Sequence, residues 1–544
     1  MLFSNFIQVS TFFNIRQTMN SFKNFLSQEK YFLVGYLLFS MPVFFFTRCY
    51  IDSADLIQYL TLAKQYTQLP LRDCANEFWS PLLSWIIIPF NFLTGDYLLA
   101  FKAIQFLISS SLYALLLFSI KRFNLSFTEK LMFSVSSGIM TIGYGIFNGS
   151  PDLLYLFVLF LIIRILNKTN MSFASATLIG LMGAMLYFSK SFGLVFFPVF
   201  LMVYYYVSGR FITSAWRYYL VAFLVFIALS SVWIIILSNK YQKLTYSGAS
   251  QYNFSIMNPS YNPNIFGEVK HPIDAVHYAL PPNNIAVSAW QEPNNFGILH
   301  WSPFNNLYHY FKVILRNLLS LLYYYSYYWV LFFASLLTVF LFSINKRKGS
   351  LVYLIKNIFH DYTKGSFHFI KILLISALIT SFLYALVLTQ KRYLWINEIC
   401  ILFFILSLNL HSDRKYLKVF LGLFTVVCAY SFGKEYYPVL NYKTNIEWRN
   451  DPIVLFLKSD KSDSAIISEA VEGADGYTIN SALCFFSGHQ NLGVQNAESM
   501  QKLKFKGYFL SSGNHTINSR KFPFIHFVVY SQKLNYSLYS AGLK

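Results

Sequence analysis

Long apolar segments separated by short polar ones fill most of this chain. They lie at about 31–47, 97–120, 131–147, 152–166, 173–188, 193–208, 218–237, 320–343, 367–388, 393–410 and 417–433. A helix needs about 20 apolar residues to cross the hydrocarbon core of a bilayer, and most of these segments approach that length. The pattern therefore predicts an α-helical polytopic membrane protein with about eleven transmembrane helices.

Two stretches depart from this pattern. The segment SPLLSWIIIPFNFL at 80–93 is short and contains two prolines, which predicts an interfacial or re-entrant helix. Beyond 433, short β-prone runs such as FPFIHFVVY alternate with Gly, Asn and Ser, which predicts a small α/β domain. The predicted organisation is a leader at 1–30, a transmembrane domain at 31–433 with long loops at 48–96 and 238–319, and a C-terminal domain at 434–544.

Composition supports membrane insertion. Hydrophobic residues make up 56% of the chain and charged residues 12%, whereas soluble proteins are about a quarter charged. The net charge of +20 comes from short Lys and Arg clusters between apolar segments, such as Lys121-Arg122. This distribution is typical of cytoplasmic anchoring of membrane helices, so we expect contact with membrane lipids and no nucleic-acid partner.

The basic clusters also predict an orientation. If the N-terminus is cytoplasmic, alternate connections on the cytoplasmic side carry Lys121, Arg122, Arg164, Arg210, Lys346, Arg347, Lys348 and Arg414. An odd number of spans then places the C-terminal domain outside. We expect a multi-pass integral membrane protein with no cleaved signal peptide. Cys49 and Cys74 could pair if their loop faces an oxidising compartment, but we favour unpaired residues.

The first outer loop, RCYIDSADLIQYLTLAKQY, carries a candidate base. Asp55, Tyr59 and Ala63 are each four residues apart and therefore share one face of a helix. A carboxylate at the lipid–water boundary can act as a general base. The structural alternative is a helix N-terminus capped by Asp52 or Ser53.

Further charged residues gather on the same predicted face. Asp152 opens an apolar segment, where it could be functional or could simply favour the helix N-terminus. Lys190, Lys391 and Arg392 lie in outer turns, against the positive-inside pattern. Snorkelling to lipid headgroups would explain each one alone. Together, beside carboxylates, they predict a site for an anionic lipid-linked ligand.

The long loop 238–319 predicts an ordered lid. Its segment PPNNIAVSAWQEPNNFGILHWSPF is rich in Pro, Asn and aromatic residues and contains Trp290, Glu292 and His300. The chain has no Walker A motif and no GxGxxG after a strand. An outer-face transferase would therefore use a lipid-borne donor.

Five of these segments together resemble the membrane glycosyltransferases of the GT-C superfamily, in the bacterial family 39-type branch near the protein O-mannosyltransferases and the aminoarabinose transferases. DLIQYLTLAKQY is similar to the family's D-E-x-x-Y-x-x-x-A segment, and FWSPLLSW, SPDLLYLF, YFSKSFGLVFFP and KRYLW are similar to later motifs in family order. The resemblance runs from about residue 30 to 410. It implies transfer of a sugar from a polyprenyl-phosphate donor to a lipid, glycan or protein acceptor on the extracytoplasmic face of the bacterial inner (plasma) membrane.

The resemblance also implies roles for single residues. Asp55 would be the general base, supported by Asp52 and Asp152, and the donor phosphate would be held by Lys190, Lys391, Arg392 and Tyr393. The candidates for the acceptor site or lid are Tyr59, Trp290, Glu292 and His300. Leu56 and Ser191 stand where the family commonly has Glu and Gly. The loss of that second acid leaves a divalent cation, Mg²⁺ or Mn²⁺, an open question, and no metal ligand is assigned.

Two other functions remain open at this stage. A glycan polymerase or ligase would use a similar donor. A transporter or flippase of a lipid-linked or anionic solute is less favoured, because the apolar segments show no internal repeat and hold almost no central charge.

Overall fold

The computed structural model describes residues 10–541 except 168–170, 209–215, 267–279, 296–298, 325, 346–364, 412–413, 442–446, 461–464, 469–474, 495–505, 513–524 and 533. Everything below concerns the described residues.

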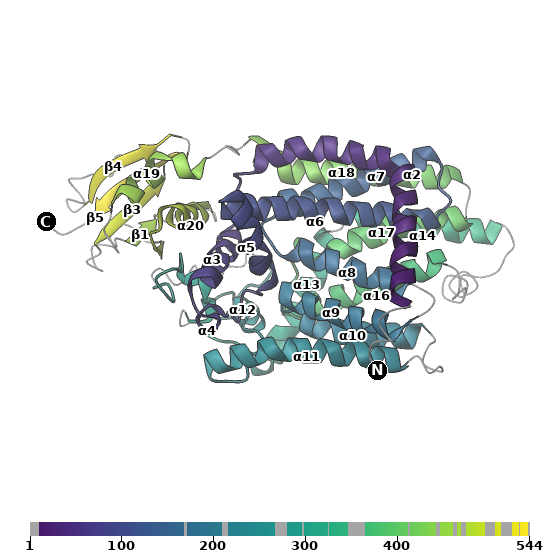
Figure 1. Cartoon of the computed structure of the whole chain (residues 1–544), viewed down its shortest axis with the longest axis horizontal. Helices are drawn as coiled ribbons and strands as arrows, with labels where there is room; N and C mark the ends of the chain where they lie inside the picture. Colours follow the sequence, from purple (N-terminus) through teal and green to yellow (C-terminus); the bar gives the residue numbers. More distant parts are fainter. Residues whose placement is uncertain are drawn as a thin grey trace.

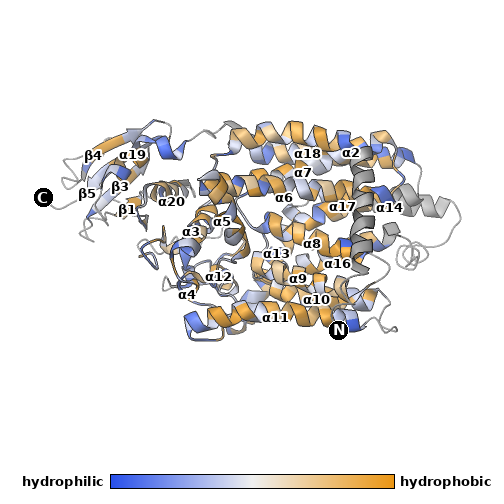
Figure 2. Ribbon diagram, viewed as in Figure 1, coloured by the Kyte–Doolittle hydropathy of each residue, from blue (hydrophilic) through white to orange (hydrophobic). Residues whose placement is uncertain are grey.

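A bundle of long apolar helices forms the body of the molecule (Figure 1). The helices are α2 (Ser10–Thr47), α6 (Tyr97–Ser119), α7 (Phe127–Ile146), α8 (Asp152–Leu166), α9 (Phe173–Ser189), α10 (Gly193–Val207), α11 (Trp216–Tyr241), α13 (Leu307–Tyr324), α14 (Ser326–Asn345), α16 (Gly365–Ala385), α17 (Trp395–His411) and α18 (Arg414–Asn441). Figure 2 shows that apolar residues dominate the parallel helices. Each predicted apolar segment lies on helix, which confirms a helical polytopic architecture.

Length and apolarity single out five of these helices as candidate membrane spans. Their apolar stretches are Glu29–Thr47, Tyr97–Arg122, Trp216–Tyr241, His368–Ala385 and Arg414–Tyr436. The helices α9 and α10 are apolar but shorter, at 17 and 15 residues. They pack within the same bundle, so the chain is a multi-pass membrane protein with spans of unequal length.

The predicted apolar segment 320–343 lies on α13 and α14, and residue 325 between them is outside the described residues. Helix α13 begins earlier than predicted, at Leu307, and is amphipathic, with His309, Val313, Asn317 and Leu321 buried at four-residue spacing. Asn317 donates its side-chain N–H to the carbonyl of Ala385 at 3.0 Å, so the polar residues of this helix face inward.

The two ends of the bundle differ in charge. Asp152 is the first residue of α8, and Arg164 lies in its last turn. The guanidinium of Arg164 lies 3.7 Å from the ring centroid of Phe118, near the end of α6 where the short 3-10 helix η1 (Ile120–Arg122) follows. The predicted cytoplasmic residues Lys121, Arg122 and Arg164 therefore gather at the end opposite Asp152. Arg210 and Lys346–Lys348 lie outside the described residues.

Short helices cover the other end of the bundle. They are α3 (Ala54–Gln68), α4 (Leu71–Cys74), α5 (Leu82–Thr94) and α12 (Ala249–Ile256), with the 3-10 helices η4 (Ala289–Gln291), η5 (Pro293–Asn295), η6 (Pro303–Asn305) and η7 (Lys391–Leu394). The predicted short helix at 80–93 is α5. It ends at Gly95, whose φ of 66° is the left-handed conformation that favours glycine at a helix C-terminus.

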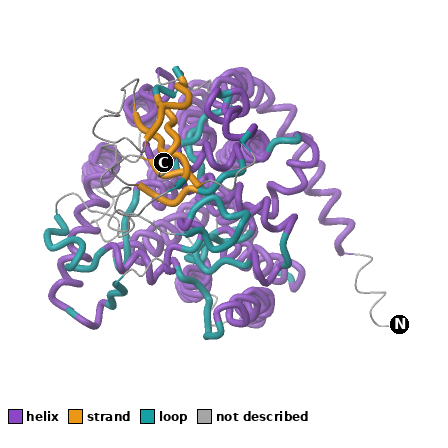
Figure 3. Tube along the Cα trace, turned by 90° about the vertical axis from the view of Figure 1, so that its left-hand side faces the viewer, coloured by secondary structure: helices purple, strands orange, loops and turns teal. Residues whose placement is uncertain are grey.

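A small mixed sheet forms the C-terminal domain, as predicted. Its elements are η8 (Trp448–Asn450), α19 (Pro452–Ser459), β1 (Ala465–Ser468), α20 (Asp475–Ser487), β2 (Asn491–Val494), β3 (Gly507–Ser512), β4 (Ile525–Ser531) and β5 (Tyr536–Ala541). The strand order is β2-β1-β3-β5-β4, with β1 parallel to both neighbours and β5 antiparallel to both. Figure 3 shows the sheet over one part of the end face, with loops beside it. Helix α18 continues to Asn441, past the boundary predicted at 433.

Candidate functional site

A cavity of about 580 Å³ lies beneath the short helices at this end of the bundle, a size typical of ligand sites. Its polar part is formed by Asp55, Asp152, Lys190 and Arg392. Its apolar wall comes from the start of α10 and the end of α16, through Phe192, Val195, Leu383, Tyr384, Val387 and Leu388. The cavity thus joins a charged end to an apolar one.

The charged side chains form an alternating array. Arg392 Nη2 lies 3.1 Å from Asp55 Oδ2, and Arg392 Nε lies 3.8 Å from Asp152 Oδ2. Lys190 Nζ lies 2.6 Å from Asp152 Oδ1. Two turns far apart in the sequence, one between α9 and α10 and one at η7, therefore bring their cations to the same carboxylate, Asp152. The predicted grouping of Asp55, Asp152, Lys190 and Arg392 is found in the structure.

Aromatic rings hold the lysine end of this array. Lys190 Nζ lies 3.3 Å from the ring centroid of Tyr393, a cation–π contact. Tyr393 stacks on Tyr384 at 4.6 Å, and Tyr384 stacks on Phe192 at 4.0 Å. Burial lowers the pKa of Lys190 to about 8, against the opposing effect of the Asp152 carboxylate. Lys190 is therefore a cation at neutral pH that loses its proton in mildly alkaline solution.

Asp55 is the carboxylate most open to the cavity. Its side chain is 23% exposed, whereas that of Asp152 is 7% exposed. The indole N–H of Trp290 donates to Asp55 Oδ1 at 3.1 Å, on the oxygen that Arg392 does not contact. Tyr59 lies one turn along α3, and burial raises its pKa well above the usual value, so it stays neutral.

Asp52 lies behind the cavity wall and does not line the cavity. Its Oδ2 accepts the backbone N–H of Gly149 at 2.8 Å, and its Oδ1 has no hydrogen-bond partner among the described residues. Burial raises the pKa of the Asp52 carboxyl, and the ammonium of Lys102 opposes this only in part. Ser53, one of the two residues proposed as the cap, is the N-cap residue of α3, but its side chain makes no capping bond.

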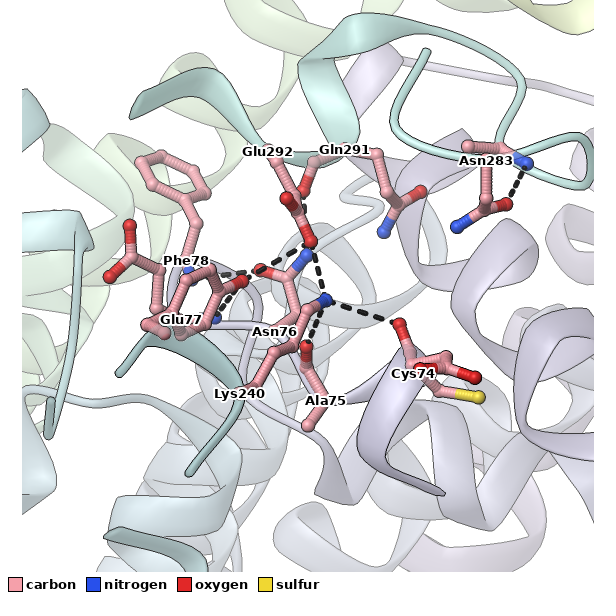
Figure 4. Close-up of polar contacts among 12 residues, drawn as sticks. Cys74, Ala75, Asn76, Glu77, Phe78, Lys240, Asn283, Gln291 and Glu292 are labelled. Atoms are coloured by element: carbon pink, nitrogen blue, oxygen red, sulfur yellow. Dashed lines mark hydrogen bonds and ion pairs between the residues drawn. The ribbon is translucent and has the colours of Figure 1, made fainter. Parts of the chain in front are cut away.

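Besides Asp52, three predicted site residues lie away from the cavity. Lys391 pairs with Glu435 on α18 and donates to Ser431 at 3.4 Å. Glu292 forms an ion pair with the ammonium of Lys240 at 2.6 Å (Figure 4). The same ammonium donates hydrogen bonds to a backbone carbonyl of α4 and to that of the residue after α4. His300 lines a second cavity.

That second cavity, of about 790 Å³, adjoins the first. The two share Tyr246, Ser247, Ser250, Phe254 and Tyr310 as lining residues. The rest of its wall mixes polar and aromatic residues with the aliphatic Leu244 and Leu307; its polar and aromatic members include Glu77, Gln251, His300, Trp301, Ser302 and Asn305. The shared residues connect this cavity to the one that holds the charged array.

Sequence reasoning missed or misread three residues. Tyr384 lies inside an apolar segment, where only its position seven residues before Lys391 could have marked it. Lys102 lies inside a predicted span yet is buried, with its ammonium donating to the carbonyl of Ile146 at 3.2 Å. Trp79 lies in the segment FWSPLLSW but was assigned no role of its own; it lines the cavity and donates its indole N–H to the carbonyl of Trp290. Cys49 and Cys74 are both unpaired by disulfide.

The fold and the site define a class: a multi-pass helical membrane protein with a charged, partly enclosed cavity at one end of its bundle, capped by a small mixed-sheet domain. No family model and no curated protein sequence matches the chain. Among solved structures, the chain is similar to ArnT from Cupriavidus metallidurans bound to undecaprenyl phosphate, with 10% identity over 95% of this chain and 100% of that chain and a TM-score of 0.43. A similarity of this degree does not assign the chain to a family.

Proposed function

We propose that this protein is a glycosyltransferase that moves a sugar from a polyprenyl-phosphate donor to an acceptor hydroxyl at the extracytoplasmic face of the membrane. The observation that carries the proposal is the Asp55 carboxylate, open to the cavity and set beside two cations and an apolar wall. This combination supplies a base, a phosphate site and room for an isoprenoid chain in one cavity.

The donor fits the two ends of the main cavity. A polyprenyl-phosphate sugar carries one negative charge on its phosphodiester and a long apolar chain. Lys190 and Arg392 are the cations that would receive the phosphate, since charge-assisted hydrogen bonds to phosphate are strong. The isoprenoid chain would lie against Phe192, Val195 and Leu383 on the apolar wall.

The transfer step follows from these positions. Asp55 takes the proton of the acceptor hydroxyl while its oxygen attacks the anomeric carbon of the sugar. The bond from that carbon to the phosphate oxygen breaks, and its electron pair stays on the polyprenyl phosphate, which gains a second negative charge. Lys190 and Arg392 stabilise this developing charge. Attack from the face opposite the phosphate inverts the anomeric configuration.

The acceptor would enter through the second cavity. Its lining of amide, hydroxyl and aromatic side chains suits an acceptor rich in hydroxyl groups. The shared residues, Tyr246, Ser250 and Tyr310 among them, then form the passage between acceptor and donor.

The donor set does not fit a resident divalent cation. Both oxygens of Asp152 already face cations, and Arg392 occupies one oxygen of Asp55. The described residues contain no group of three or more His, Cys, Asp or Glu that could hold a metal. A bound Mg²⁺ would have to displace Arg392 or Lys190, so the proposed transfer is assigned to the side chains alone.

The test compares envelope glycolipids, glycans and proteins from deletion cells and from cells complemented with variants, by mass spectrometry. Wild type should restore one sugar mass that Asp55→Asn, expressed at the same level, does not restore, because loss of a general base costs about 10²- to 10⁴-fold in rate. Asp73→Asn, an exposed acid in the same loop, is the matched control and should restore it. Full transfer by Asp55→Asn would refute the role of Asp55, and long missing chains instead of one sugar would indicate a polymerase.

A further inference from the structure

The segment 283–292 carries Trp290, which contacts Asp55, and it is hydrogen-bonded to residues of the first outer loop. Gln58 donates to Ser288 Oγ at 3.2 Å, and Trp79 donates to the carbonyl of Trp290 at 3.1 Å. Asn76 donates to the carbonyl of Gln291 at 2.7 Å. At the end of the segment, the ion pair of Glu292 with Lys240 adds a further attachment (Figure 4).

The C-terminal domain is also hydrogen-bonded to the segment 283–292. The backbone N–H of Asn491, the first residue of β2, donates to the carbonyl of Val287 at 2.7 Å, and Asn491 forms a parallel bridge with Ser288. Gln490 donates its side-chain N–H to the carbonyl of Asn283 at 2.9 Å. The segment thus continues the edge of the sheet beyond β2.

A residue of α20 completes this contact. The hydroxyl of Tyr477 interacts with the side chain of Ser288 and the backbone of Trp290, and burial raises its pKa to about 12. Tyr477 is therefore neutral and able to donate a hydrogen bond at physiological pH.

The contact is rigid on the domain side. Asn480 donates to Asn491 Oδ1 at 2.7 Å, and Asn491 donates to Ser481 Oγ at 3.0 Å, so α20 fixes the edge residue. All three side chains are buried. Since α20 also packs against α3, which carries Asp55, the domain contacts both partners of the Trp290–Asp55 hydrogen bond.

We propose that the C-terminal domain positions the catalytic base: Tyr477, Gln490 and Asn491 hold the segment 283–292 so that the indole N–H of Trp290 orients the Asp55 carboxylate. Arg392 holds one carboxylate oxygen and Trp290 the other, so loosening the segment frees the carboxylate to rotate away from the acceptor. The three are positioning residues, because none of them lines the cavity. The catalytic consequence rests on the proposed function, whereas the positioning itself does not.

The positioning is tested by amide hydrogen exchange on the full-length protein in detergent. The double variant Tyr477→Phe/Gln490→Leu keeps both side-chain volumes but removes their hydrogen bonds to the segment. We expect the amide hydrogen-exchange rate of residues 285–291 to rise about fivefold for each hydrogen bond lost. Tyr530→Phe, an exposed hydroxyl on β4 that pairs only locally with Asn535, should leave that exchange unchanged. Unchanged exchange in the double variant would overturn the proposal.

Its consequence is tested by a double-mutant cycle on transfer. The double variant should lower kcat about tenfold with less than a threefold change in KM for the polyprenyl-phosphate donor, and it should have no further effect in a Trp290→Phe background. Independent losses that multiply in the combined variant would overturn action through Trp290. If wild type transfers no sugar at all, the proposed function fails, while the exchange result still decides whether the domain positions the segment.

Discussion

Asp55 and Asp152 both face Arg392, yet their surroundings give them different chemistry. Asp152 is nearly enclosed and has cations at both oxygens, whereas Asp55 is partly open and has the neutral indole of Trp290 at its second oxygen. In the proposed transfer, Asp55 is the base because it is the carboxylate open to the cavity, and Asp152 places Lys190 and Arg392.

Lys190 makes the proposed transfer sensitive to alkaline pH. Its pKa is lowered to about 8 by burial, so it is charged below that pH and loses its charge as the pH rises through it. We expect the transfer rate to fall with a midpoint near that pH, measured as a rate profile from about pH 6 to 10.

The control for this prediction is Lys190→Arg, because a guanidinium keeps its proton throughout that range. The variant should be slower at neutral pH, since it no longer fits against Tyr393, but its alkaline decline should disappear. A decline of the same midpoint in Lys190→Arg would assign the titration to another group.

Arg392 is expected to be irreplaceable by lysine. Its guanidinium uses two different nitrogens to reach Asp55 and Asp152, which a single ammonium cannot do. Arg392→Lys should lower kcat/KM for the donor at least about tenfold. Lys391→Gln, the neighbouring position that points toward Glu435, is the matched comparison and should stay within about threefold of wild type. Equal losses would show that both residues bind the donor, as the sequence predicted.

At the scale of elements, the turn before α8 is built on a close approach to α3. A Cβ on Gly149 would lie 2.2 Å from Asp52 Oδ1 and 2.7 Å from Leu56 Cβ. Because this turn also leads into Asp152, its distance from α3 sets the separation of the two carboxylates that share Arg392.

Gly149→Ala should therefore destabilise the protein by about 1–3 kcal/mol, the usual cost of forcing extra volume into a packed site, and reduce transfer as well. Thermal unfolding in detergent measures the first effect. Gly422→Ala in α18, where nothing lies within 4 Å of the new Cβ, should be neutral or slightly stabilising, as alanine is in a helix. A similar loss in both variants would contradict the close contact at Gly149.

Elements were predictable from the sequence where lipid imposes the pattern. Apolar segments marked the bundle helices because membrane-facing side chains must be apolar. The start of α13 at Leu307 was missed because Asn317 and His309 face inward while apolar residues face outward, so its sequence is polar where the helix begins and apolar where it ends. At the site, Lys190 and Arg392 were predictable because they are basic residues in turns on the predicted outer side. The sequence around Lys391 does not show that its side chain points toward α18 while that of Arg392 enters the cavity.

At the scale of the whole molecule, the contact of the C-terminal domain with the segment 283–292 could not be predicted. The β-bridge joins Ser288 and Asn491, which are far apart in the sequence. No periodic pattern in the sequence indicates such a contact. Gln490, Asn491 and Tyr477 look like ordinary polar residues of a small domain. Only the fold brings them to within one hydrogen bond of the residue that orients Asp55.

The proposed function also requires a definite orientation of the molecule. The basic residues Lys121, Arg122 and Arg164 lie at the end of the bundle opposite the cavity, so the positive-inside rule predicts that the cavity and the C-terminal domain face outside. Cysteine labelling of intact spheroplasts with a membrane-impermeant maleimide tests this. Asn305→Cys, exposed beside the second cavity, should react directly, whereas Thr128→Cys, exposed at the basic end, should react only after permeabilisation.

The native cysteines give little background in this experiment, because four are buried and Cys49 is half-buried. The reverse pattern of labelling would place the cavity in the cytoplasm. Nucleotide-activated donors would then be within reach, and the case for a lipid-borne donor would rest only on the apolar wall formed by α10 and α16. Labelling of Asn305→Cys from outside would instead place the cavity on the outer side. Both this location and the apolar wall of the cavity would then favour a donor carried by a lipid.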